Sequence, residues 1–187
     1  AEEGSTVYVP AGDYLLTPVF LKSGITFWLD GGARLLGEID RTEYPVLPGI
    51  CGEGDARRNF GTWQGEEANC FASVLTAINC KNIAIIGEGT VDGNALSSDW
   101  YQNHRVMRIA WRPRGLFFNR CNGVLVQGIT VRDTPSWNVH PYFCKNVKLY
   151  NLGLYNAPSM PTTDGIDPDC CENVDIAGVN ISVGDDC

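Results

Sequence analysis

The feature that most constrains the fold is a short template that recurs along the chain. Each copy begins with a cysteine, and alternating apolar positions follow after two residues. The copies span residues 80–87, 121–128, 144–151 and 171–178, so the cysteines are separated by 41, 23 and 27 residues. A second short apolar segment follows three of the copies, at 129–131, 152–154 and 179–181. Self-similarity at an interval of 20 to 30 residues indicates a solenoid.

The kind of residue in the template decides between two solenoids. Leucine-rich repeats have a similar period, but here the alternating positions are mainly Ile and Val, and Asn and Gly supply turns. This pattern favours a coil made only of strands, a parallel β-helix. Equivalent positions of successive coils stack about 4.8 Å apart in such a fold. We therefore expect an inward ladder of four cysteines, as free thiols rather than disulfides because buried Cys packs like a small hydrophobic residue: Cys80, Cys121, Cys144 and Cys171.

The rest of the chain predicts further coils with two interruptions. Residues 24–29 resemble a divergent coil, and residues 6–10 and 14–16 predict opening strands. The 41-residue step predicts an insertion between Asn94 and Arg114, and residues 41–65 predict a long surface loop. Long loops on a rigid scaffold commonly serve a functional site. Residues 1–187 are expected to form one incomplete β-helix domain.

Charge and hydropathy exclude several kinds of partner. The net charge of -8 argues against nucleic acid, and no run of about 18 apolar residues predicts a membrane span. An anionic sugar polymer would need a local basic patch. One candidate is a stretch of four arginines, for which a solvated loop is an equal alternative: Arg105, Arg108, Arg112 and Arg114. No signal peptide is visible, and the opening residues are typical of a processed N-terminus.

Three carboxylates provide the candidate catalytic group. Asp164 lies 21 residues before Asp185, close to one coil, and Asp186 follows directly. We expect all three on one side of the solenoid, where like charges raise one another's proton affinity and leave one carboxyl protonated. A proton donor beside a carboxylate base is what glycosidic hydrolysis requires. Because neighbours in a strand face opposite sides, Gly184 must mark a bulge or turn.

Two other interpretations of these residues stay open. Asp and Gly are common in turns, so each motif alone has a purely structural explanation. Carboxylates can also bind calcium, and Asp167 and Asp169 would add ligands, although the spacing of a calcium-binding loop is absent.

The motifs resemble those of the polygalacturonase family of glycoside hydrolases, family 28. The resemblance rests on Thr162–Pro168 and Gly184–Cys187, with support along nearly the whole chain from 9–14, 92–94, 112–114, 136–141 and 172–174. It implies a right-handed parallel β-helix that hydrolyses α-1,4-linked galacturonic acid with inversion and without a metal or other cofactor. Asp185 would be the general acid, and Asp164 and Asp186 would position and deprotonate water.

The same resemblance implies a partner and a location. The partner would be an anionic plant cell-wall polysaccharide, pectin or oligogalacturonide, and the protein would be secreted or periplasmic. The motifs are most similar to a bacterial and plant-like branch in which exo-acting members are frequent.

Two departures from the family pattern affect these expectations. Thr162 stands where the family usually has Asn, which changes a substrate-binding position. The family's later Gly-His-Gly and Arg-Ile-Lys segments, which supply a histidine and basic residues, are absent from the sequence. We therefore expect an N-terminal part of a longer protein, truncated on the C-terminal side of the solenoid and with little activity alone.

Other polar and aromatic residues are candidates for substrate binding. His140 falls near the predicted carboxylate face, and Thr162 and Arg112 belong to the family motifs; a structural role is the alternative for His140. Trp100, Tyr101 and Trp111 could stack on a sugar ring or anchor a loop in the core, and His104 is a weaker candidate. The glycosylation motif at 180–182 falls in a predicted strand and is interpreted as chance.

Two alternative functions fit the same architecture. A pectate lyase would use calcium and a basic residue to abstract a proton. A β-helical adhesin or tailspike stalk would bind glycan without catalysis.

Overall fold

The template copies form successive strands of one parallel sheet in the computed structural model, which describes residues 2–49 and 60–187. This sheet has the order β1-β4-β11-β14-β17-β19. Template residues align across it, with Ile83 beside Val124, Val124 beside Val147 and Val147 beside Val174. The strands are β1 (Thr6–Val9), β4 (Thr26–Leu29), β11 (Lys81–Gly87), β14 (Asn122–Gln127), β17 (Lys145–Tyr150) and β19 (Glu172–Ala177).

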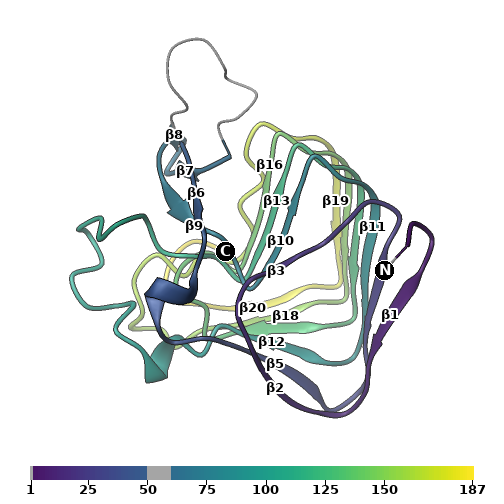
Figure 1. Cartoon of the computed structure of the whole chain (residues 1–187), viewed down its shortest axis with the longest axis horizontal. Helices are drawn as coiled ribbons and strands as arrows, with labels where there is room; N and C mark the ends of the chain where they lie inside the picture. The colour runs from purple at the N-terminus through teal and green to yellow at the C-terminus, as the bar shows by residue number, and fades with distance from the viewer. Residues whose placement is uncertain (1, 50–59) are drawn as a thin grey trace.

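Two further parallel sheets complete each coil (Figure 1). One follows the template strands: β2 (Gly12–Leu16), β5 (Ala33–Gly37), β12 (Thr90–Asp92), β15 (Thr130–Arg132), β18 (Gly153–Tyr155) and β20 (Asn180–Ser182). The other precedes them: β16 (Val139–Tyr142), β13 (Leu116–Asn119), β10 (Leu75–Ile78) and β3 (Val19–Phe20). Three stacked parallel sheets confirm the predicted parallel β-helix.

Left-handed backbone at three fixed positions makes the corners of the coil. The residue before each template cysteine, the second residue after it and the seventh after it all have positive φ. Asparagine and glycine tolerate this conformation best, which explains their recurrence at the second and seventh residues after the cysteine. The corner residues are Asn79, Arg120, Phe143 and Cys170, then Asn82, Gly123, Asn146 and Asn173, then Gly87, Gly128, Asn151 and Gly178.

The template cysteines form the predicted inward ladder of free thiols. Cys80, Cys121 and Cys144 are buried, and Cys171 in the last coil is partly buried. The backbone N–H of Cys121 donates to Cys144 Sγ at 3.4 Å, and that of Cys144 donates to Cys171 Sγ at 3.4 Å. Cys51 lies outside the described residues. The thiols therefore link neighbouring coils without disulfides.

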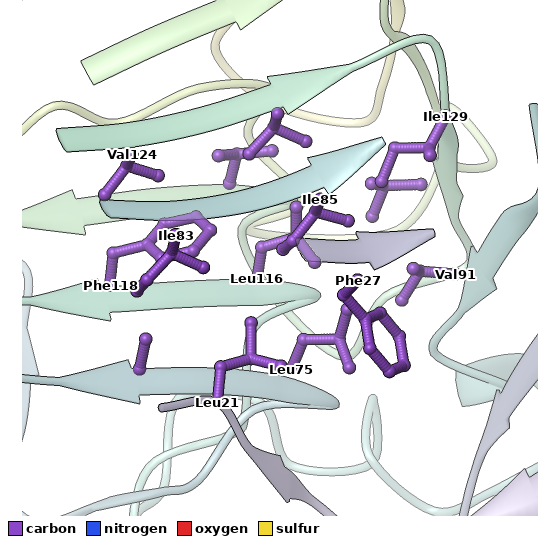
Figure 2. Close-up of a cluster of buried hydrophobic side chains, with 14 of the residues drawn as sticks. Leu21, Phe27, Leu75, Ile83, Ile85, Val91, Leu116, Phe118, Val124 and Ile129 are labelled. Atoms are coloured by element: carbon purple, nitrogen blue, oxygen red, sulfur yellow. The ribbon is translucent and has the colours of Figure 1, made fainter. Parts of the chain in front are cut away.

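One continuous apolar core fills the solenoid (Figure 2). Ile83 and Ile85 from β11 face Leu75 and Leu116 of the opposite sheet, and all four are at most 2% exposed. Alternation along each strand sends every second side chain inward, as the sequence predicted. Truncating such a residue to alanine typically costs 2–5 kcal/mol, so this core is the rigid support on which the loops stand.

Two insertions pack against each other on one side of the coil. The first contains η1 (Arg41–Glu43) and two antiparallel pairs, β6 (Val46–Leu47) with β9 (Cys70–Phe71) and β7 (Thr62–Trp63) with β8 (Glu66–Glu67). The second includes η3 (Ala95–Ser97). A satellite core of Tyr44, Phe71, Ala95, Trp100 and Ala110 joins them. Figure 1 shows β6 to β9 beside the sheet that ends in β16.

The insertion at 94–114 was predicted. In the segment 41–65, expected to be a surface loop, the described residues instead include η1, β6, β7 and buried aromatic side chains. Tyr44 and Trp63 in that segment are 4% and 6% exposed, and residues 50–59 of it lie outside the described residues. Its buried aromatic side chains therefore anchor the insertion to the coil.

Candidate active site

The segment that carries Asp164 extends the sheet that ends in β16. Isolated parallel bridges join Val139 to Ile166 and Tyr142 to Asp169, and Ile166 packs on the main core. Asn138 fixes the start of this segment, because its backbone N–H and its side-chain amide each donate to the Asp164 carbonyl at 2.9 Å. Asn138 is fully buried in a polar network with Thr134 and Asn156. The backbone of Asp164 is thus held from the preceding coil.

A bend after β20 presents the other two carboxylates. Thr163, which is fully buried, accepts a hydrogen bond from the Gly184 N–H at 3.0 Å and donates to the Met160 carbonyl at 2.9 Å. The N–H of Gly165 donates to the Asp186 carbonyl at 2.8 Å. The chain leaves the regular strand at Gly184, as predicted, so Asp185 and Asp186 are both exposed.

The three acids converge at one point of the surface. Oxygen atoms of Asp164, Asp185 and Asp186 all lie within 4.8 Å of one another. Asp164 is partly buried, and Asp185 and Asp186 are exposed. In residues 2–49 and 60–187 no other group of three or more acidic, histidine or cysteine side chains is as close. The 21-residue spacing predicted this convergence; the roles of the three acids remain a prediction.

Burial and mutual repulsion raise proton affinity in this cluster. Partial burial raises the pKa of Asp164 to about 6, and Asp185 and Asp186 add to the shift while Arg112 opposes it. Burial, followed by the charge of Asp164, raises the pKa of Asp167 to about 7 against the effect of Arg114. The cluster therefore holds a proton in mildly acidic solution, as acid–base chemistry requires.

Arg112 lies beneath the cluster and supports it through Thr162. Arg112 is 4% exposed, and its guanidinium donates to the Pro135 carbonyl at 2.6 Å and to the Thr162 hydroxyl. The Thr162 N–H donates to Asp185 Oδ2 at 3.0 Å. Arg112 and Thr162 were predicted to bind substrate, and that role stays a prediction. The geometry gives the buried Arg112 a supporting position, while Thr162 faces a pocket.

Thr162 adopts an unusual backbone conformation for its residue type. Its φ is +55°, in the left-handed region that β-branched residues disfavour and asparagine tolerates. The family's asparagine at this position suits that conformation. In this chain the contact with Arg112 and the hydrogen bond to Asp185 hold the threonine there.

Two pockets flank an aromatic wall beside the acids. The indole rings of Trp111, Trp63 and Trp137 stack in that order, with centroids 4.7 and 5.3 Å apart. The first pocket, of about 480 Å³, is lined by Trp63, Gln64, His104, Arg105, Trp111, Pro161, Thr162 and Asp185. The second, of about 500 Å³, is lined by residues 64–65, Trp137, His140 and 166–170. Asp185 therefore opens onto a cleft with aromatic and basic walls.

His140 is buried at the base of the second pocket. It is 1% exposed and lies between Trp137, Phe117 and Tyr142, with Nε2 3.9 Å from Asp169 Oδ2. Burial lowers its pKa to about 4, so the ring is neutral at ordinary pH. Its Nδ1 has no hydrogen-bond partner among the described residues. His140 therefore lies beside Asp169, in the segment that carries Asp164, while its predicted position near the face of the three acids and its binding of substrate stay predictions.

The structure divides the remaining candidates between the cleft and the core. Trp111 and His104 line the first pocket. Trp100 is fully buried against Tyr44 and Phe71, so its possible stacking on a sugar is wrong and its core role is correct. Tyr101 is also turned inward and donates to the Thr134 carbonyl at 2.6 Å.

The predicted basic patch is reduced to one exposed side chain. Arg108 pairs with Asp99 at 2.8 Å, and Arg112 and Arg114 are buried. Arg105 is exposed and lines the first pocket beside Asp185. One cation is therefore available here for an anionic ligand.

The three acids could also supply part of a calcium site, because carboxylate oxygens are its preferred ligands. Asp167 and Asp169, which this alternative added, do not belong to the group within 4.8 Å. The alternative thus depends on the same three side chains as the hydrolytic hypothesis.

Replacing Asp167 with asparagine is expected to stabilise the protein at high pH. The raised pKa means that the folded state holds a proton between about pH 4 and 7 that the unfolded state has lost, so stability falls as pH rises through this window. The variant avoids this loss and should gain about 1–2 kcal/mol at pH 8, after allowance for solvent screening. At pH 4 the difference should vanish. Urea unfolding at both values measures it.

A matched control for this prediction is Asp175→Asn on the exposed face of β19. It should show no comparable gain at pH 8. If Asp167→Asn is instead less stable than the parent at pH 8, the ionised Asp167 makes a favourable contact with Arg114 that outweighs its burial.

Three contributors to the site escaped the sequence reasoning. Trp63 lies in an insertion with no repeat, so no register relates it to the acids. Asn138 and Trp137 belong to a quoted motif but carried no predicted role. Their position one coil before Asp164 was the available signal, because equivalent positions of adjacent coils stack.

Comparisons with known proteins agree with this architecture. The family model described as glycosyl hydrolases family 28 matches residues 2–187. The chain is 30% identical to a probable polygalacturonase of Vitis vinifera, with 100% of the chain and 37% of that protein aligned. It is 25% identical to an exopolygalacturonase of Zea mays over 97% of the chain and 39% of that protein. The chain thus spans less than half the length of these relatives.

Solved structures share the fold. An exopolygalacturonase of Thermotoga maritima superposes with a TM-score of 0.80 at 24% identity, covering 96% of this chain and 45% of that one. A family 28 exopolygalacturonase of Yersinia enterocolitica gives 0.81 at 21% identity, covering 100% and 39%. The match of the family model over residues 2–187 shows that the chain belongs to glycosyl hydrolases family 28.

Proposed function

We propose that the full-length protein containing this chain hydrolyses the galacturonosidic bonds of pectin or polygalacturonate. The observation that carries the proposal is the convergence of Asp164, Asp185 and Asp186 within 4.8 Å beside an open pocket. Family membership and relatives named polygalacturonase support this substrate class. The partner is an anionic plant polysaccharide, and the protein acts outside the cytoplasm, secreted or periplasmic. The described residues contain no helix long and apolar enough to cross a membrane.

In the proposed reaction Asp185 donates a proton to the departing glycosidic oxygen. It is the carboxylate that lines the first pocket, and the Thr162 N–H orients it. Asp164 and Asp186 hold and deprotonate the attacking water. Asp164, whose pKa is raised to about 6, carries the proton of the cluster in mildly acidic solution, and transfer of that proton to the neighbouring Asp185 leaves Asp164 ionised as a base and Asp185 protonated as the acid.

The stereochemistry of the reaction is a separate part of the proposal. The family resemblance implies inversion, in which water attacks from the opposite face. Paired carboxyl groups are about 6.5–9.5 Å apart in typical inverting enzymes and about 5–5.5 Å apart in retaining ones. Oxygens within 4.8 Å are nearer the second spacing. We propose inversion with the water held between two of the three acids, and the anomeric configuration of the first product tests it.

The cleft offers features that suit a uronic acid. Arg105 and His104 lie on the pocket wall beside Asp185, and Trp111 presents an aromatic side chain there. An exposed cation attracts the sugar carboxylate, and an aromatic face suits the apolar side of a pyranose ring. Attack at chain ends is proposed because relatives include exopolygalacturonases.

The test compares the products that the full-length protein releases from polygalacturonate. Hydrolysis predicts new reducing ends without ultraviolet absorbance from an unsaturated product, and it predicts no effect of a chelator. An unsaturated product that disappears with chelator would show a calcium-dependent lyase instead. Binding without any cleavage would show a glycan-binding β-helix. Release of monomer or dimer with little loss of viscosity identifies attack at chain ends.

A further inference from the structure

A third pocket, here called the groove, lies on the opposite side of the coil from the two pockets beside the acidic cluster. It has a volume of about 640 Å³ and crosses three successive coils at the corner that follows β4, β11 and β14. Its lining residues are Trp28, Asp30, Gly31, Ile86, Gly87, Glu88, Leu125, Gln127 and Gly128, and they include none of the three acids. Figure 1 shows β11 on the other side of the solenoid from β6 to β9.

An exposed tryptophan forms one wall of this groove. Trp28 is 47% exposed, and Tyr8 supports it in an edge-to-face contact with ring centroids 5.9 Å apart. Tyr8 pairs with Trp28 across β1 and β4, Trp28 pairs with Ile86, and Ile86 pairs with Gln127. A row of outward side chains therefore runs along the solenoid axis, beginning with two aromatic residues and continuing through Ile86 and Gln127 to Tyr150 of the next coil.

Glycines let neighbouring coils approach closely at the corner that lines the groove. Gly87 and Gly128 have φ of +120° and +83°, and a Cβ on either would collide with the backbone of the neighbouring coil, at Leu29 and Gly87 respectively. In the next coil the corner residue is Asn151, whose amide lies against Gly178. A side chain occupies the corner there, and no residue of that coil lines the groove.

The polar groups in the groove select an uncharged ligand with many hydroxyl groups. Asp30, Glu88 and Gln127 supply carboxylate and amide oxygens, and neither acid takes part in an ion pair among the described residues. No Lys, Arg or His lines the groove. An anionic uronide would meet uncompensated negative charge, whereas sugar hydroxyls can donate to these oxygens. An aromatic wall with a few convergent polar groups is typical of small-molecule recognition.

From these observations we infer that the groove beside Trp28 binds a neutral polysaccharide chain, stacked on Trp28 and hydrogen-bonded to Asp30, Glu88 and Gln127. This site is separate from the proposed catalytic cleft and does not depend on the activity of that cleft. It would hold the protein on uncharged glycan that accompanies an anionic substrate. An extended chain can run along the row because successive coils repeat at about 4.8 Å.

The test is affinity electrophoresis of the full-length protein through gels that contain galactan, arabinan or xyloglucan, with chelator present. We expect retardation by at least one of these neutral polymers. Trp28→Ala should weaken binding by about tenfold or more, since truncating a central aromatic contact typically has an effect of this size. Trp28→Phe should retain part of the binding. The control is Phe20→Ala, which removes an aromatic residue that is 46% exposed on β3, in another sheet.

Four results would overturn the inference. They are no retardation of the parent protein by any neutral polymer, equal retardation of Trp28→Ala, binding of polygalacturonate that Trp28→Ala abolishes, and self-association that Trp28→Ala abolishes in sedimentation. Asp185→Asn should reduce hydrolysis of polygalacturonate and leave the binding of neutral polysaccharides unchanged. The hydrolysis assay and the gel assay therefore test the catalytic proposal and the groove proposal separately.

Discussion

Asp185→Asn in the full-length protein is expected to reduce hydrolysis of polygalacturonate by about 10²- to 10⁴-fold, the usual contribution of a general acid. Asparagine keeps the size of the side chain and can still accept the Thr162 N–H, which now lies 3.0 Å from Asp185 Oδ2. The amide has no proton to give to the departing oxygen. The loss should therefore appear in kcat, with a small change in KM, and reducing-end assays measure both.

An activated substrate separates the role of Asp185 from that of Asp164. An aryl galacturonide with a good leaving group needs no protonation, so Asp185→Asn should recover most of its rate on it. Asp164→Asn should stay impaired, because attack by water is still required. The opposite pattern would assign the acid to Asp164, whose pKa is raised to about 6 by partial burial.

The control for these variants is an acid in the same coil but outside the cleft. Asp175 lies on β19, is exposed and accepts a hydrogen bond from the Tyr150 hydroxyl. Asp175→Asn should leave kcat and KM unchanged. An equal loss in Asp175→Asn would show that the last coil is sensitive to any change of charge, and the catalytic assignment would then have no support from the rates.

The sequence predicted the coil well because its constraints repeat. Asparagine or glycine recurs at two left-handed corners, two and seven residues after each template cysteine, and the same alternation sends Ile83, Val124 and Val147 inward. The same register placed Asp164 one coil from Asp185. A periodic pattern therefore determines both the strands and the side of the solenoid on which a residue lies.

Burial within the loops could not be predicted in the same way. Trp63 and Trp100 lie in insertions without a repeat, and only tertiary packing sends Trp63 to the cleft wall and Trp100 to the satellite core. Arg112 and His140 carry polar groups that sequence reasoning assigned to substrate. The structure places them 4% and 1% exposed, beneath the residues that face the pockets.

Gly184→Ala is expected to disrupt the site more than its size suggests. An added Cβ would overlap the Met160 carbonyl and lie 2.9 Å from Thr163 Oγ1 and 3.0 Å from the Ala157 carbonyl. Two of these neighbours are backbone atoms of the turn before Thr162, so that turn must move. Overpacking of this kind typically costs about 1–3 kcal/mol. Urea unfolding of the full-length protein measures the loss.

The same displacement should reduce activity by about 10²-fold, since a shift of about 1 Å in a catalytic group has effects of this order. Gly31→Ala is the matched control, because its Cβ would meet nothing closer than Glu88 Oε2 at 3.6 Å. Stability and rate like those of Gly31→Ala would contradict the prediction. If Gly184→Ala keeps its stability but loses its rate, the turn has moved without unfolding, and the contact from the Thr162 N–H to Asp185 is the one that catalysis requires.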